Sequence, residues 1–118
     1  MSITAAGLTA LRKYVQDNWK YVSILDGASA ELLRLEIGVD ARCTVYDDYT
    51  VNPLILQIVL SGDDLDITLG DIVSGVSLYD VAVAGSALLT ETLSSNFTFE
   101  YTEDELTIKV TIEIPDIT

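Results

Sequence analysis

The sequence predicts a mainly β protein, an antiparallel β-sandwich with one short N-terminal helix. Short apolar segments recur at roughly ten-residue intervals between glycine, asparagine and aspartate turns, a spacing typical of sandwiches. Alternation of apolar and polar residues is strongest near the C-terminus, whereas a helical repeat occurs near the N-terminus. The 118 residues fit a single domain, 1–118, with a helix over about 4–17 and a sandwich over about 19–115.

The helix is predicted to begin after Thr4, whose side-chain oxygen can accept a hydrogen bond from a free first-turn amide. Gly7 lies in the first turn and weakens the helix by about 1 kcal/mol relative to alanine, so we expect the helix to depend on packing. The apolar residues that share one side at helical spacing are Leu8, Leu11, Val15 and Trp19.

The first strands follow the helix. Residues 19–25 form one predicted strand, Asp26-Gly27 marks a turn, and residues 32–37 form the antiparallel return strand. A third strand is predicted over 39–46, with Val39 and Cys43 facing the interior. The segment 47–53 is a predicted loop because Asn-Pro disfavours helix and removes a hydrogen-bond donor.

Residues 54–60 are almost entirely apolar, which predicts a central strand covered on both faces. A turn with a short extended piece follows at 64–69. One or two strands are expected over 72–83, and Ala84-Gly85 turns the chain into a strand over 86–93. The last two strands, predicted to form a hairpin, carry Phe97, Phe99 and Tyr101 and then Leu106, Ile108, Val110, Ile112 and Ile114 on one face.

Composition excludes several classes of function. The net charge is −13, and after Arg42 a single basic residue, Lys109, accompanies fourteen acidic residues, which disfavours binding to DNA or RNA. With no histidine and one cysteine, the chain lacks the usual zinc ligands, histidine-based catalysis and an intramolecular disulfide. No apolar segment approaches about 18 residues, and no signal peptide is visible, so we expect a protein made in a cytoplasm that does not bind a membrane.

The acidic stretch SGDDLDITLGD, residues 61–71, is the best candidate for a metal site because Ca²⁺ prefers carboxylate and carbonyl oxygens. Its spacing does not match an EF-hand, and Leu65 and Ile67 alternate with the acids as on a strand that leaves a turn. We therefore favour a turn that faces solvent or a partner, and expect no cofactor. The weak metal candidates are Asp63, Asp64, Asp66 and Asp71.

Other carboxylate pairs, such as Asp47-Asp48, have nothing to orient one as an acid against another, so we expect no enzyme. The helix offers a more interesting surface, because its polar side carries basic residues in an otherwise acidic chain. We expect this end to contact neighbouring subunits or other proteins. For the aromatic residues Trp19 and Tyr21 core packing is favoured, and contact with a partner is the alternative. The candidate contact residues are Arg12, Lys13, Gln16, Trp19 and Tyr21.

The stretch GVSLYDVAVAGSALLTETLSSNFTFEYTEDELTIKVTIEIP, Gly75 to Pro115, resembles a β-module of virion proteins from tailed bacteriophages. Its parts correspond to an LYD corner, a glycine turn, an LL strand, an aromatic strand and a closing DELTI strand. The N-terminal ITAAGLTALRKY followed by YVSILDG is similar to the opening of phage tail and fibre proteins. In the stretch from Gly75 to Pro115, the corner, turn and three strands named above are, in order, Leu78-Tyr79-Asp80, Gly85, Leu88-Leu89, Phe97 to Tyr101 and Asp104 to Pro115.

The resemblance implies a non-enzymatic structural protein of the virion that acts through protein–protein contacts in the tail, neck or fibre-attachment region. Fibre proteins that begin this way continue into a shaft or receptor-binding tip, whereas this chain stops at Thr118, which implies a joining or decorating role. Homo-oligomers and other virion proteins are the implied partners. Head decoration is an alternative, and a calcium-dependent carbohydrate-binding module is an alternative of another class.

Overall fold

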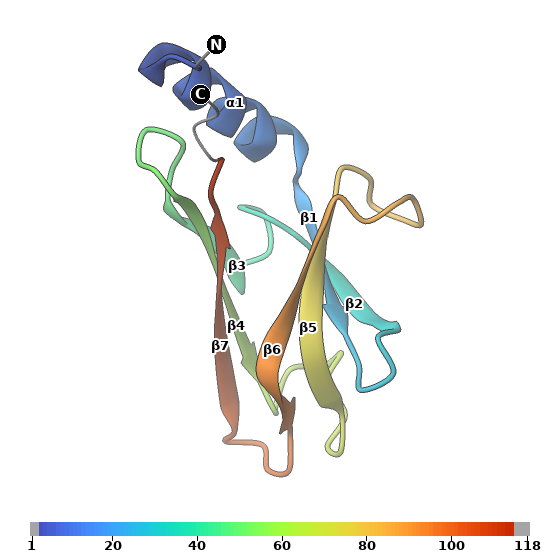
Figure 1. Ribbon diagram of the computed structural model, residues 1–118. Coiled ribbons are helices and arrows are strands. Elements are labelled where there is room, and N and C mark those ends of the chain that lie inside the picture. The colour runs from blue at the N-terminus through green and yellow to red at the C-terminus, as the bar shows by residue number, and fades with distance from the viewer. Residues whose placement is uncertain (1–2, 115–118) are drawn as a thin grey trace.

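The computed structural model describes residues 3–114 as two antiparallel sheets with one helix, α1 (Figure 1). One sheet has the strand order β2-β1-β5-β6 and the other β3-β4-β7, which confirms the predicted sandwich-like β fold. The molecule is elongated, with extents of 51 × 26 × 24 Å. The elements are α1 Ala5–Asn18, β1 Tyr21–Leu25, β2 Glu31–Glu36, β3 Cys43–Asp47, β4 Leu54–Ser61, β5 Ile72–Tyr79, β6 Leu89–Thr98 and β7 Glu105–Ile112.

The core lies between the two sheets and is built from alternate residues of the strands. β4 and β7 pair over eight consecutive residues, from Leu54 opposite Ile112 to Ser61 opposite Glu105. Along β7 the buried residues Ile108, Val110 and Ile112 alternate with exposed ones, as the sequence predicts. In the other sheet the fully buried side chains include Val22, Ile24, Val73, Val76 and Leu78.

α1 stands at one end of the sandwich, where it contacts the strands at few points (Figure 1). The predicted cap is confirmed, because Thr4 Oγ1 accepts a hydrogen bond from the Gly7 amide at 3.1 Å. Val15 is buried, but Leu11 is 42% exposed, so the prediction that Leu11 shares the packed side was wrong. The inward position is taken by Arg12, which binds a backbone carbonyl.

The connection between β2 and β3 differs from the predicted strand over 39–46. Gly38 has a φ of +81°, and the Asp40 amide donates to the Glu36 carbonyl at 2.9 Å, which turns the chain. Val39 is therefore 73% exposed instead of facing the interior. Cys43, where β3 begins, is fully buried as predicted.

The middle of the chain departs from prediction in smaller ways. β4 is the central strand of its sheet, but only its inward side is fully buried and the other side is half-buried. Residues 64–69 form turns without an extended piece. β5 is a single strand, and Ala84 and Gly85 both adopt positive φ at the predicted turn, after which β6 starts at Leu89.

The predicted C-terminal hairpin was wrong, because β6 and β7 belong to different sheets. β6 ends at Thr98, and the chain crosses from one sheet to the other through residues 99–104. At this crossing Phe99 packs into the core and is fully buried, whereas Tyr101 is 60% exposed. Phe99 and Phe97 pack edge to face with ring centroids 5.0 Å apart. Alternation identified the inward face of β7 and the burial of Phe99 correctly, but it placed Tyr101 on the inward face wrongly and could not say which sheet each strand joins.

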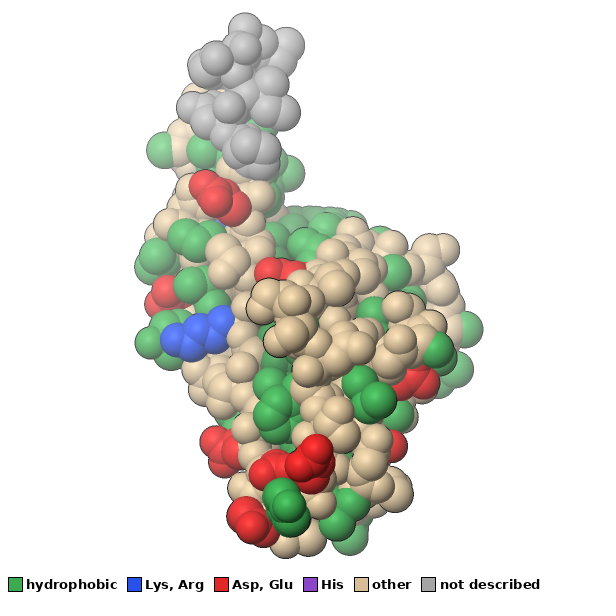
Figure 2. Space-filling view, turned by 60° about the horizontal axis from the view of Figure 1, so that its bottom comes forward, with side chains coloured by type: hydrophobic (Ala, Val, Ile, Leu, Met, Phe, Trp, Pro, Cys, Tyr) green, Lys and Arg blue, Asp and Glu red, His purple; other side chains and the backbone are tan. Residues whose placement is uncertain are grey.

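The two ends of the sandwich carry different surfaces. Loops 26–30, 62–71 and 99–104 meet at one end, which we call the acidic end. Two hydrogen bonds hold these loops: the Gly70 amide donates to the Phe99 carbonyl, and Ser74 Oγ donates to the Asp26 carbonyl. These loops contain eight acidic residues and no basic one, and Figure 2 shows carboxylate side chains across this end. The opposite end, the helix end, comprises α1 with loops 48–53 and 80–88.

Candidate functional site

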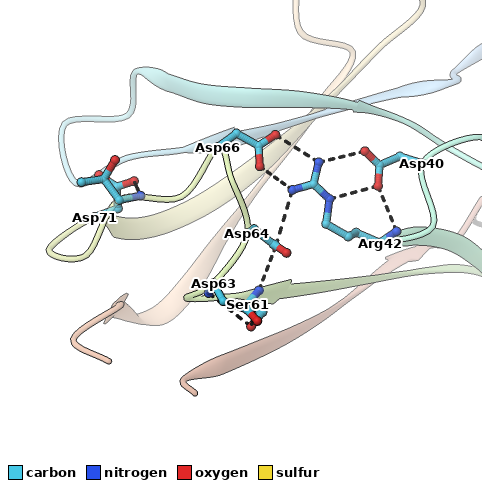
Figure 3. Close-up of polar contacts among 8 residues, drawn as sticks. Asp40, Arg42, Ser61, Asp63, Asp64, Asp66 and Asp71 are labelled. Carbon is cyan, nitrogen blue, oxygen red and sulfur yellow. Dashed lines mark hydrogen bonds and ion pairs between the residues drawn. The ribbon is translucent and has the colours of Figure 1, made fainter. Parts of the chain in front are cut away.

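Two aspartates of the acidic stretch 61–71, Asp64 and Asp66, point toward a single arginine, Arg42, which directly precedes β3 (Figure 3). The Arg42 carbonyl accepts a hydrogen bond from the Val59 amide at 2.8 Å, which fixes its backbone beside β4. Asp40, in the preceding turn, accepts from Arg42 Nε at 3.0 Å and from Nη2 at 2.9 Å. The backbone amide of Arg42 also donates to Asp40 at 3.0 Å, so one carboxylate orients both the turn and the side chain.

Two aspartates of the acidic stretch complete this cluster, which we call the Arg42 cluster (Asp40, Arg42, Asp64, Asp66). Asp66 is bidentate, with Oδ1 2.6 Å from Nη1 and Oδ2 3.1 Å from Nη2. Asp64 Oδ2 lies 3.4 Å from Nη1 and also accepts from the Ser61 amide at 3.0 Å. The guanidinium is therefore shared by three carboxylates from two loops, a geometry that its planar fork of donors favours.

The electrostatics of the Arg42 cluster favour the charged forms of Asp40, Arg42 and Asp66. Hydrogen bonds to Asp40 and Asp66 raise the pKa of Arg42, against a smaller opposing effect of burial. The hydrogen bond from Arg42 lowers the pKa of Asp40 and, likewise, that of Asp66. A carboxylate with a lowered pKa stays ionised at neutral pH and is a poor proton donor. Asp40 and Asp66 therefore keep their ion pairs with Arg42, which join the two loops.

The remaining two metal candidates point elsewhere. Asp63 accepts from Ser61 Oγ at 2.6 Å, and Asp71 Oδ2 accepts from the Thr68 amide at 2.8 Å. Such contacts stabilise turns. The four aspartates do not converge, and within residues 3–114 no group of three or more His, Cys, Asp or Glu side chains is arranged to hold a metal ion. The depression beside Arg42 is shallow, and its rim carries the fully exposed Leu65.

Two of the predicted contact residues hold α1 onto the sandwich. Arg12 is only 5% exposed; its Nε donates to the Tyr49 carbonyl at 2.9 Å, and its Nη2 donates to Thr9 Oγ1 at 3.2 Å. Gln16 Oε1 accepts from the Tyr49 amide at 2.9 Å. Arg12 therefore does not lie on the solvent side of the helix as the sequence suggested. Both residues clamp the backbone of loop 48–53.

The other predicted contact residues differ in exposure. Lys13 is exposed and pairs with Asp17 at 2.6 Å, a contact that raises the pKa of Lys13 through the hydrogen bond from its ammonium group. Trp19 packs against the core while partly exposed, and Tyr21 is half-buried at the start of β1. The exposed face of α1 displays instead Leu11 and Tyr14, which is 62% exposed.

A second arginine site, at Arg34, was not predicted from the sequence. Arg34 of β2 lies with its guanidinium 3.7 Å from the ring centroid of Tyr79 and pairs with Glu31 at 2.6 Å. Its Nη1 donates to the carbonyls of Val81 and Ala84, both at 2.9 Å, which fixes loop 80–88 against the outer face of the sheet. The only sequence signal was one arginine in an otherwise apolar and acidic strand. Its partners lie 47 and 50 residues away.

Loop 80–88, held in this way, presents apolar side chains to solvent. Val83 is 81% exposed, and Val81 and Leu88 are about half as exposed, at 40% and 39%. Tyr79, the last residue of β5, pairs with Tyr21, the first residue of the strand that follows α1, so the loop belongs to the helix end. Comparison of the chain with known protein families, with curated proteins and with solved structures finds no match. In the described part of the chain, no helix has the length and apolar character needed to cross a membrane.

Proposed function

We propose that this chain is a non-enzymatic structural protein of a tailed-phage virion that acts through protein–protein contacts in the tail, neck or fibre-attachment region. The resemblance of Gly75 to Pro115 and of the N-terminal segment to phage virion modules supports the class of protein. A two-sheet sandwich with a helix standing off one end suits a component that joins neighbours, because it presents separate surfaces at its two ends.

The observation that carries the proposal is the set of exposed apolar side chains at the helix end. α1 contributes Leu11 and Tyr14, and loop 80–88 contributes Val81, Val83 and Leu88. Single exposed apolar residues are ordinary, and the acidic end also exposes Leu65, Leu69 and Tyr101. At the helix end, the exposed apolar side chains share one helix face and one arginine-fixed loop, which suits a surface that is covered by a partner. A loop fixed in place also loses less conformational entropy when it binds.

The polar groups that are best suited to chemistry are engaged within the fold, which further supports a contact role. Asp40, Asp64 and Asp66 contact Arg42, and the other aspartates of the acidic stretch close turns. Cys43 is fully buried, and burial raises the pKa of its thiol to about 12, so it is not a reactive thiolate.

The experiment is a reconstitution of phage particles that lack this chain. Wild-type protein, Leu11→Asp and Leu65→Asp are added separately, and the chain retained on purified particles is quantified. Leu65 is the matched control, because it is also an exposed leucine but lies at the acidic end. We expect wild type and Leu65→Asp to be retained and Leu11→Asp to be lost. Retention of Leu11→Asp at the wild-type level would contradict the role of the helix end.

A further inference from the structure

The two sheets have four edge strands, and one of them differs from the others. The pairings that involve β2, β3 and β6 each contain a register shift, at Ile24/Leu25, Val45/Asp47 and Val73/Gly75. Such irregularities twist an edge and hinder the addition of a further strand. β7 pairs with β4 over eight consecutive residues without any shift. Its edge is therefore the one with the regular geometry that strand addition requires.

The outward hydrogen-bonding groups of β7 can be assigned from the ladder. The Gly62 amide donates to the Asp104 carbonyl at 2.8 Å, one step beyond the pair Ser61 and Glu105. In an antiparallel ladder, alternate residues bond to the partner strand and the others direct both backbone groups away from it. The even-numbered residues of β7 therefore bond to β4, and Glu105, Thr107, Lys109 and Thr111 direct their amides and carbonyls outward. Within residues 3–114, no strand pairs with this edge.

The charges on the exposed face of β7 favour self-pairing in particular registers. Lys109 is the only basic residue after Arg42, and its ammonium lies 3.8 Å from the ring centroid of Tyr46 on the outer face of the sheet. When two copies pair antiparallel around Thr111, each Lys109 opposes Glu113 of the other copy, the residue that directly follows the last residue of β7, Ile112. When they pair around Thr107, each Lys109 opposes Glu105. Opposite charges on directly opposed residues stabilise an antiparallel pair.

We propose that β7 pairs with β7 of a second copy of this chain, which joins the two three-stranded sheets into one six-stranded sheet. The contact is isologous, so one edge serves both copies and neither edge stays open. The Thr111 register is expected, because it keeps the acidic ends of the two copies apart. This inference deepens the proposed function by naming a partner, but it concerns the isolated protein and can fail while virion incorporation stands.

The first test measures the mass in solution by sedimentation over a dilution series. The wild type is expected near twice the 12.8 kDa of one chain at high concentration. Proline at an outward position removes only a donor that β4 does not use, so Thr111→Pro and Thr107→Pro should both fold. In the Thr111 register, Thr111→Pro is monomeric, whereas Thr107→Pro and the control Thr111→Val remain dimers. A monomeric wild type, or a dimer that survives both prolines, overturns the proposal.

The second test locates the twofold axis with single cysteines. A residue on the axis of an antiparallel pair opposes itself at a Cα separation of about 5.5 Å, which suits a disulfide. Under mild oxidation we expect Thr111→Cys to form a covalent dimer and Lys109→Cys to form none. The buried Cys43 serves as a silent background. A dimer from Thr107→Cys alone supports the same edge in the other register, and no covalent dimer from either threonine position overturns the proposal.

Discussion

Replacement of Arg42 by methionine tests whether the acidic stretch is held by an ion-pair cluster. The side chain of Arg42 is 23% exposed and has bidentate contacts with Asp40 and Asp66. Exposed pairs contribute about 0.2–1 kcal/mol, whereas breaking a buried pair costs about 3–5 kcal/mol. The partial exposure places Arg42 between these limits, so we expect Arg42→Met to lower the free energy of unfolding by about 2–3 kcal/mol.

The same variant has a characteristic dependence on pH. Asp40 and Asp66 have lowered pKa values in the folded state, so their contribution to stability is present above the unfolded pKa of about 3.9 and is lost as the pH falls through the folded values. In Arg42→Met these carboxylates lose their partner and repel one another. The difference in stability between wild type and variant should be constant above about pH 5 and shrink below about pH 4.

Thermal and urea unfolding at several pH values measure this effect. A loss of 2–3 kcal/mol corresponds to a melting temperature lower by roughly 6–15 °C in a domain of this size. Lys20→Met is the control for the lost positive charge, because Lys20 is exposed. Arg42→Lys keeps the charge but not the planar fork, and should recover less than half of the loss. Equal stability of Arg42→Met and Lys20→Met would refute the cluster as a structural element.

Three further changes give sharp outcomes. Arg34→Met should free loop 80–88 and accelerate both its proteolysis and its amide exchange, with β4 unaffected; unchanged protection would contradict the clamp. Gly62→Ala places a Cβ 2.2 Å from the Tyr101 carbonyl oxygen, whereas Gly70→Ala meets no atom within 4 Å and carries only the strain of a φ of +100°. Urea unfolding should therefore show the larger loss for Gly62→Ala, and the reverse order would refute the close approach. Calcium at millimolar concentration should leave the melting temperature unchanged, because the aspartates of the acidic stretch contact groups within the fold. A bound ion at 100 times its Kd would raise the free energy of unfolding by about 2.7 kcal/mol, so a clear rise in the melting temperature would refute this prediction.

Much of the fold could be predicted because it depends on local signals. Period-two alternation gave β7 and its inward face, and Asp26-Gly27 gave the turn between β1 and β2. Thr4 marked the start of α1. At Leu11 the helical repeat was insufficient, because residues 11 and 12 are both compatible with a packed side that also includes Val15. The hydrogen bond from Arg12 to loop 48–53, 37 residues away, decided between them.

The long-range features could not be read from local patterns. The crossing between β6 and β7 looks like a hairpin in sequence, because alternation identifies a face and not a sheet. The Arg42 cluster joins residues 24 positions apart. In the sequence, the four aspartates of the acidic stretch resemble a metal loop, but only Asp64 and Asp66 contact Arg42, while Asp63 and Asp71 close turns. The crossing between β6 and β7 and the Arg42 cluster both depend on which segments lie close together in the folded chain, and the packing of the whole sandwich decides this.

The central claim is that this chain is a structural part of a tailed-phage virion. Quantitative mass spectrometry of purified particles, with tails and heads separated, tests it most directly. We expect a fixed number of copies per particle, which co-purify with tails and stay bound during washing in high salt. Absence of the chain from the purified particles would contradict the proposed role.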